Sequence, residues 1–250
     1  WAERYDRDLA DVFAVQDEIT QAVVAAIEAQ LYAAEDFRAR RKTPDNMDAW
    51  DLVMRALSHY WRVTRQDNLV AQALLEKAIN VDPGYGQALS LLAACHTFSA
   101  HMGWEDMSKA VPVAERAALA AIRADSEDAW AHYALASVYL FHRRFDVCIA
   151  EFELAIRNPL YRTPEIALIN AGKCSASLGD TAASEAYFKR AFATSPNNPQ
   201  ASYGLALLAY RSTRLDDARA WMKPVMLQAN PTPEALYLGM CIERKQGDRE

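Results

Sequence analysis

The sequence predicts an all-α protein, a right-handed α-solenoid of antiparallel helix pairs, and three observations lead to this prediction. Only 8 of the 250 residues are glycine, about half the usual share of ~7%, which argues against an all-β fold with many tight turns. The chain is rich in alanine, leucine, glutamate and arginine, which are strong helix formers. Similar residues recur every 34 positions, as at Ala167, Ala201 and Ala235, and such a period is typical of stacked helical repeats.

Composition and charge exclude several classes of partner. With 27 basic and 33 acidic side chains the net charge is −6, which gives no electrostatic reason to bind nucleic acid. No apolar run reaches the ~18 residues that a membrane-spanning helix needs. We therefore expect no nucleic-acid partner and no membrane span, and a chain long enough to bury its own core.

The N-terminal residues 1–42 lie outside the period. Their apolar residues recur mostly at intervals of three or four, which predicts one amphipathic helix over roughly 8–35. A basic run, Arg38 to Lys42, follows before Thr43-Pro44. We interpret this run as a solvated linker, and the alternative is a nucleic-acid patch. The apolar stripe consists of Leu9, Val12, Phe13, Ile19, Val23, Ile27 and Leu31.

Helix pairs are expected along the rest of the chain. Two irregular pairs occupy 43–128, the second with an eight-residue extension, Ser99 to Asp106, between its helices. Three regular repeats follow over 129–232, and 233–250 is the first helix of a further repeat. The expected boundaries are proline-containing turns, at Asp82-Pro83-Gly84, Asn158-Pro159, Ser195-Pro196 and Asn230-Pro231.

The regular repeats resemble the tetratricopeptide repeat family. That family places small residues where the two helices of a pair cross, because close approach of helices requires small side chains, and it fills the space around them with larger ones. Counting from Ala129 and from Glu165, the matching residues are Leu135, Ala136, Tyr139, Cys148, Phe152 and Ala155, then Gly172, Phe188, Ala191 and Pro196.

Two narrower resemblances divide the chain near residue 157. Through the segment Trp1 to Ile19, residues 1–157 resemble the repeat region of TolB-like and adenylate cyclase-type bacterial regulators. Residues 158–250 resemble the PilF and PilW pilus biogenesis proteins, through Asn158-Pro-Leu-Tyr161, Asn170-Ala-Gly172 and the residues from Thr232 to Gly239. The chain is then either an engineered or recombined chimera or a natural repeat array. We expect a cytoplasmic protein, or a periplasmic one if the PilF-like segment sets the context.

No motif in the sequence indicates catalysis. The five histidines form no metal-binding run, and there is neither a glycine-rich phosphate loop nor a nucleophile elbow. Four isolated cysteines favour buried thiols over a zinc site or a disulfide framework. We therefore expect no enzyme, no cofactor and no metal. The cysteines are Cys95, Cys148, Cys174 and Cys241.

The resemblance implies a binding surface on the concave face, which in this family is lined by the first helix of each pair. Mapped onto this sequence, those positions are rich in tyrosine and arginine, which are favoured at interfaces. They predict a groove for an extended or helical peptide carrying an acidic group, and the alternative is that these side chains pack inside the fold. The candidates are Trp130, Tyr133, Phe141, Ile169, Lys173, Tyr203, Tyr210, Arg211, Tyr237, Arg244 and Lys245.

The sequence thus favours a non-catalytic scaffold that binds a protein or peptide through its concave face. A second hypothesis concerns 233–250, where Leu236, Leu238 and Met240 are expected to expose an apolar face that stacks on another copy, giving a dimer or a filament. A third is an accessory arm of a larger cyclase-type or transcription-type regulator, or a pilus-assembly factor.

Overall fold

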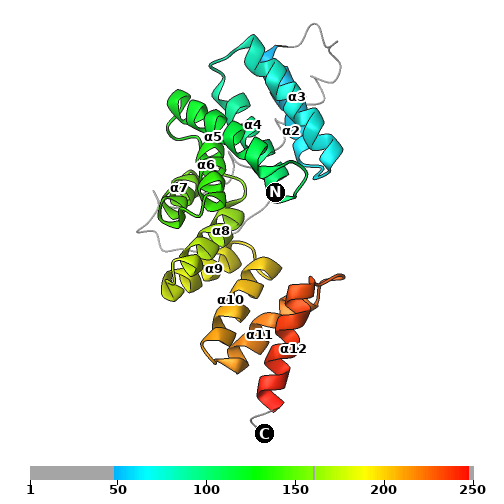
Figure 1. The fold of residues 1–250 in the computed structure, drawn as a ribbon, viewed down its shortest axis with the longest axis vertical. Coiled ribbons are helices and arrows are strands. Elements are labelled where there is room, and N and C mark those ends of the chain that lie inside the picture. The colour runs from blue at the N-terminus through cyan, green and yellow to red at the C-terminus, as the bar shows by residue number, and fades with distance from the viewer. Residues whose placement is uncertain (1–47, 160, 248–250) are drawn as a thin grey trace, which may run out of the picture. The chain divides into compact units, whose positions relative to one another are not determined.

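The computed structural model describes residues 48–159 and 161–247, and the predicted amphipathic helix over 8–35 lies outside them. The described residues are helical with short loops and contain no strand, so the predicted all-α fold is confirmed. They form two compact units. The first unit holds helices α2 to α5 and the second holds α6 to α12 (Figure 1).

The first unit consists of two helix pairs. Polar side chains start three of its helices: Asp48, Thr64 and Asp106 each accept a hydrogen bond from a backbone N–H of the first turn, which satisfies donors that the helix itself cannot. The pairs are α2 (Ala49–Tyr60) with α3 (Arg65–Val81), and α4 (Gly86–His101) with α5 (Met107–Ala124).

The extension expected between α4 and α5 is shorter than the sequence suggested. Residues Ser99 to His101 continue α4, so only Met102 to Asp106 connect the two helices. Ser99 stays helical because it faces the interior, where its hydroxyl donates to Asn68 Oδ1 at 2.9 Å. The repeat period predicted that this helix ends before Ser99. The contact with Asn68 extends α4 beyond that point, to His101.

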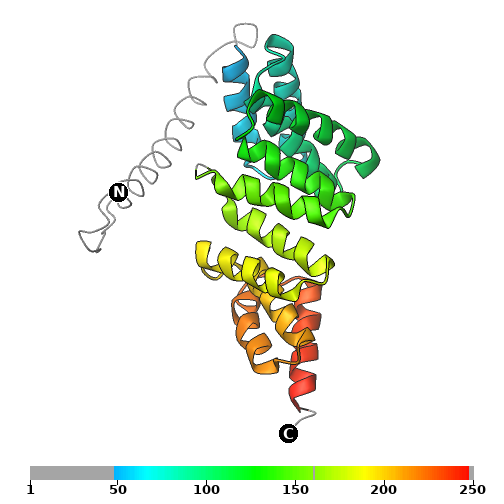
Figure 2. The same cartoon turned by 90° about the vertical axis from the view of Figure 1, so that its left-hand side faces the viewer.

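The second unit consists of three helix pairs and one further helix, drawn in green to red in Figure 2. Proline opens α8, α10 and α12 at the first turn, where its missing N–H costs no hydrogen bond. The elements are α6 (Ala129–Phe141), α7 (Phe145–Arg157), α8 (Pro164–Ser177), α9 (Thr181–Thr194), α10 (Pro199–Arg211), α11 (Leu215–Met226) and α12 (Pro233–Gly247).

Each of the five described helix pairs turns through one residue in the left-handed region. Its φ lies between 55° and 84° in every case. Two of these residues are glycines, which adopt this conformation without steric cost, whereas Thr213 and the other non-glycine residues adopt it with some strain. The turn geometry thus recurs along the array although its residue type does not. The residues are Val63, Gly103, Arg143, Gly179 and Thr213.

Glycine allows an aromatic ring to sit between helices in the second unit. The Phe188 side chain of α9 is 5% exposed, and a Cβ at Gly172 would lie 3.0 Å from its ring while one at Gly204 would lie 2.6 Å away. Leu168, Ile169 and Leu205 complete the cluster around the ring. This is the close crossing that the repeat pattern predicts at Gly172 and Phe188, with Gly204 as a second close contact.

The cysteine prediction was wrong for one pair. Cys148 of α7 and Cys174 of α8 are joined in a disulfide, because consecutive helix pairs bring two positions 26 residues apart into contact. Cys95 and Cys241 are free thiols, the first buried and the second partly exposed. Burial raises the pKa of the Cys95 thiol, so this side chain stays protonated.

Candidate functional site

The predicted residues of α6 are only partly accessible. Trp130, Tyr133 and Phe141 are all partly buried, and the Tyr133 ring packs against Phe152 of α7 at 5.6 Å between ring centroids. Burial raises the pKa of the Tyr133 hydroxyl. These side chains therefore contribute to packing as well as to any surface.

On α8 the two predicted residues differ sharply. Ile169 is 1% exposed and belongs to the cluster around Phe188, so a partner cannot reach it and we leave it out of the site. Lys173 is exposed at the surface, and its Nζ donates to Asn170 Oδ1 at 3.5 Å. Desolvation by neighbouring side chains lowers the pKa of Lys173.

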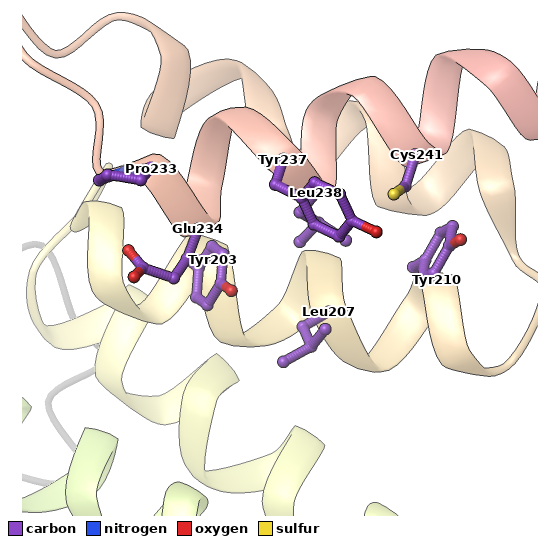
Figure 3. A pocket seen from close by; sticks show the side chains of 8 residues that line it. All are labelled: Tyr203, Leu207, Tyr210, Pro233, Glu234, Tyr237, Leu238 and Cys241. Carbon is purple, nitrogen blue, oxygen red and sulfur yellow. The ribbon is translucent and has the colours of Figure 1, made fainter.

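Three of the predicted tyrosines line one cavity between α10 and α12, which we call the α10/α12 groove (Figure 3). Its volume is about 580 Å³, within the size range of ligand-binding clefts. Every lining residue belongs to the second unit. They are Tyr203, Leu207, Tyr210, Pro233, Glu234, Tyr237, Leu238 and Cys241.

Helical periodicity explains why these side chains meet. Tyr203, Leu207 and Tyr210 follow each other at intervals of four and three along α10, and Tyr237 and Cys241 are four apart on α12, so each set lies on one helix face. Helix α12 contacts α10 as well as α11. The two faces therefore form the two walls of the groove.

The tyrosine hydroxyls supply the main polar groups of the groove. Tyr237 is 70% exposed, and its hydroxyl interacts with the Cys241 thiol, which is the main reason why the pKa of Tyr237 is raised. In Figure 3 the Tyr237 hydroxyl and the Cys241 sulfur point toward each other above Tyr210. The exposed Tyr237 ring therefore offers contact area at the edge of the groove, while its hydroxyl faces Cys241.

The two ends of the groove carry opposite charge. Glu234 lies in the first turn of α12 beside Tyr203. At the other end the Lys245 ammonium lies 4.3 Å from the centre of the Tyr210 ring, in a cation–π contact. Arg211 ends α10 and Arg244 precedes Lys245 in the last turn of α12. The groove is thus acidic at the start of these helices and basic at their end.

Five lining residues were not among the predicted candidates: Leu207, Pro233, Glu234, Leu238 and Cys241. Leu238 was expected on the exposed apolar face, and this was wrong: it is 5% exposed in the core formed with Ile242 and Met222. The spacing of Ala235, Leu238 and Ile242 on α12 was the available signal, because intervals of three and four mark the buried face. Leu236 and Met240 are exposed, at 44% and 70%.

Metal sites require a group of ligand side chains that lie close together. Residues 48–159 and 161–247 contain no group of three or more histidine, cysteine, aspartate or glutamate side chains placed to hold a metal ion. Of the helices that the structure describes, none is both long and apolar enough to span a membrane.

Comparison with known proteins agrees with the repeat pattern. Residues 176–238 match the family model described as a tetratricopeptide repeat. Putative adenylate cyclase 3 of Rhizobium meliloti (strain 1021) is 32% identical over 151 residues, which cover 58% of this chain. The match covers 25% of that protein, so this chain corresponds to about a quarter of the relative's length.

Several solved structures share the fold. PilF of Pseudomonas aeruginosa has a TM-score of 0.68 at 19% identity, over 80% of this chain and 85% of its own. PilW, a widely conserved type IV pilus biogenesis factor, has a TM-score of 0.64 at 25% identity, over 80% and 86%. YrrB, a repeat protein with an unusual peptide-binding site, has a TM-score of 0.53 at 19% identity, over 70% and 85%.

Both resemblances inferred from the sequence are thus found, one to a cyclase-named protein and one to PilF and PilW. The structural likeness to PilF and PilW extends over 80% of the chain, well beyond residues 158–250. The shared property is the repeat fold itself, and a likeness of fold does not carry a function with it.

Proposed function

We propose that this tetratricopeptide repeat chain is a non-catalytic scaffold that docks a peptide or protein segment in the α10/α12 groove. The observation that carries the proposal is the cavity of about 580 Å³ in which Tyr203, Tyr210 and Tyr237 come together. Tyrosine supplies a large rigid contact area and a hydroxyl at little cost in conformational entropy, which is why it is frequent in binding surfaces.

The chemistry of the groove favours binding over catalysis. Glu234 is the one carboxylate among the lining residues, and at the start of a helix a carboxylate interacts favourably with the helix dipole. No histidine, lysine or second carboxylate lies among the other lining residues to form an acid–base pair with it. YrrB, which shares the fold, is described as having a peptide-binding site. The cyclase activity named for the longer relative is not part of this proposal.

The remaining candidates extend the proposed surface along the second unit. Trp130, Tyr133, Phe141 and Lys173 lie on α6 and α8, the first helices of their pairs. A segment longer than the groove would reach these residues next. Arg211, Arg244 and Lys245 would meet acidic groups at the basic end.

Selection from a random peptide library on the immobilised chain tests the proposal. Peptides enriched on the wild-type protein should lose binding to the double variant Tyr203→Ala, Arg211→Ala, whose helical circular dichroism should be unchanged. The matched control is Leu236→Ala, an exposed position of α12 outside the groove. Equal loss of binding in the control, or no enrichment on the wild-type chain, would refute docking in the groove.

A second candidate function, self-assembly, rests on exposed apolar side chains of α12, of the last residue of α11 and of Leu227 directly after it. Met226, Leu227, Leu236 and Met240 are 45%, 86%, 44% and 70% exposed, and Leu236 and Met240 are four residues apart on one face of α12. Exposed apolar patches mark interaction surfaces. Sedimentation velocity over a hundredfold concentration range checks it. A sedimentation coefficient that rises with concentration and falls back in Met240→Glu supports self-assembly, whereas a constant monomer value removes it.

A further inference from the structure

The spacing of Tyr203 and Tyr210 along the axis of α10 matches one type of extended backbone. Tyr203 and Tyr210 are seven residues apart on α10, which is roughly 10 Å along the helix axis. A polyproline II segment repeats every three residues, or about 9 Å. Rings about one such turn apart can pack on either side of a ridge of the segment, as in other aromatic-lined grooves that take this conformation.

The hydroxyl groups of the groove suit the same backbone. A polyproline II segment makes no internal hydrogen bonds, so its carbonyl oxygens are free to accept. Tyr203 and Tyr210 each bring an O–H to the groove, and a phenol can donate one such bond. A helical ligand has satisfied most of its carbonyls already and would offer these donors few acceptors.

The charges at the two ends set the length and polarity of the occupant. Glu234 and Lys245 are eleven residues apart on α12, or about 16 Å. At ~3.1 Å per residue, a polyproline II segment covers that distance with about five residues. A basic side chain at one end of such a segment would meet Glu234, and an acidic one at the other would meet Lys245.

From these three observations we infer that the occupant of the α10/α12 groove is an extended proline-rich segment, with a basic residue and an acidic residue flanking about five central residues. The inference rests on the proposed function and adds the chemical class of the partner. Apolar area comes from prolines against the rings of Tyr203 and Tyr210, and orientation comes from the end charges. A segment already extended in solution loses little conformational entropy on docking.

The test uses two synthetic peptides that differ only in their central residues. Each is a fluorescein-labelled heptapeptide with arginine first and aspartate last; one has proline, leucine, proline, proline and leucine between them, and the other has alanine at the three proline positions. Fluorescence anisotropy with the full chain should give a dissociation constant about tenfold lower for the proline peptide. Equal affinity, or tighter binding of the alanine peptide, would overturn the inference.

Protein variants then locate the contact. Tyr210→Ala should weaken binding of the proline peptide about tenfold or more, Tyr210→Phe should have a smaller effect, and Leu236→Ala should have none. If the control weakens binding as much as Tyr210→Ala does, the peptide binds elsewhere and the inference is wrong.

A charge exchange tests the polarity. A proline heptapeptide with arginine at both ends should bind the wild-type chain about twofold to fivefold more weakly than the arginine–aspartate peptide. The Lys245→Glu variant should instead bind the peptide with two arginines more tightly than the arginine–aspartate peptide. An unchanged order of affinities in Lys245→Glu would contradict the assignment of the two ends.

The outcomes separate this inference from the proposed function. If both heptapeptides bind equally and Tyr210→Ala weakens both, the groove docks peptides of another conformation, so the proposed function stands and the inference falls. If neither heptapeptide binds, the inference also falls, while the library selection on the double variant decides the proposed function independently.

Discussion

Two helix junctions, one in each unit, are packed with different kinds of side chain. In the first unit α3 meets α4 through hydrogen-bonded polar side chains that are almost fully buried, Asn68, Gln72 and Ser99. In the second unit α9 meets α8 and α10 through one aromatic ring, Phe188, set against Gly172 and Gly204. Each junction brings a helix of one pair against a helix of the next.

The polar junction is held by a closed set of partners. Asn68 Oδ1 accepts from Gln72 Nε2 at 2.8 Å and from Ser99 Oγ at 2.9 Å, and Asn68 Nδ2 donates to the Cys95 carbonyl oxygen at 3.3 Å. Such a network stabilises one arrangement because each missing partner leaves a buried polar group unsatisfied.

The aromatic junction depends instead on space. The Phe188 ring occupies volume that side chains at Gly172 and Gly204 would otherwise fill, and a well-packed interior tolerates neither voids nor extra atoms. The comparison shows that one repeat fold accepts two kinds of junction. The aromatic one follows the small-residue and large-residue pattern predicted from the sequence, and the polar one lies in the first unit.

The largest expected effect is at the aromatic junction. Phe188→Ala removes a ring that is 5% exposed and should lower the free energy of unfolding by about 3–5 kcal/mol, through lost burial and a residual cavity. Urea denaturation followed by circular dichroism measures this change. A loss below about 1 kcal/mol would show that the junction collapses around the gap.

At the polar junction we expect a smaller loss. Asn68→Ala leaves the Cys95 carbonyl and the Gln72 amide without one partner each, which should cost about 1–3 kcal/mol. The same denaturation experiment checks it. In a cycle with Ser99→Ala the two losses should not add, because both residues belong to one network; strict additivity would contradict the network.

A further prediction contrasts two glycines of the second unit. Gly204→Ala places a Cβ 2.6 Å from the Phe188 ring, so an overpacking cost of about 1–3 kcal/mol outweighs or cancels the ~1 kcal/mol that alanine gains in a helix. Gly239→Ala is the matched control: its Cβ would lie 3.9 Å from the nearest atom. It should stabilise the chain, and two identical shifts in unfolding midpoint would refute the role of Phe188.

The smallest effect is expected at the start of α3, beside the polar junction. Hydrogen bonds from Thr64 and His59 hold the pKa of Asp67 at about 2, below its ordinary value of 3.8. Because the pKa is lowered in the folded state, this stabilisation is present above about pH 4 and is lost as the pH falls toward 2. Asp67→Asn should flatten the acid dependence of the unfolding midpoint over that range, and an unchanged slope would contradict the assignment.

The candidate site was predictable to a limited extent. Repeat positions placed Tyr203, Tyr210 and Tyr237 on one surface, and these three residues line the groove. The same rule selected Ile169, which is buried, because a position facing the concave side in one pair is covered when the next pair packs closely over it. It also missed Leu238, whose burial depends on Met222 of α11.

The sequence by itself determined the all-α class, the helical repeat and the close crossing at Gly172 and Phe188, because these depend on local propensity and on a spacing that repeats within a few dozen residues. Tertiary structure alone decided the disulfide between Cys148 and Cys174, the buried network of Asn68, and the groove between α10 and α12. Each of these joins residues of different helix pairs, and a one-dimensional pattern does not record how closely two packed helices approach.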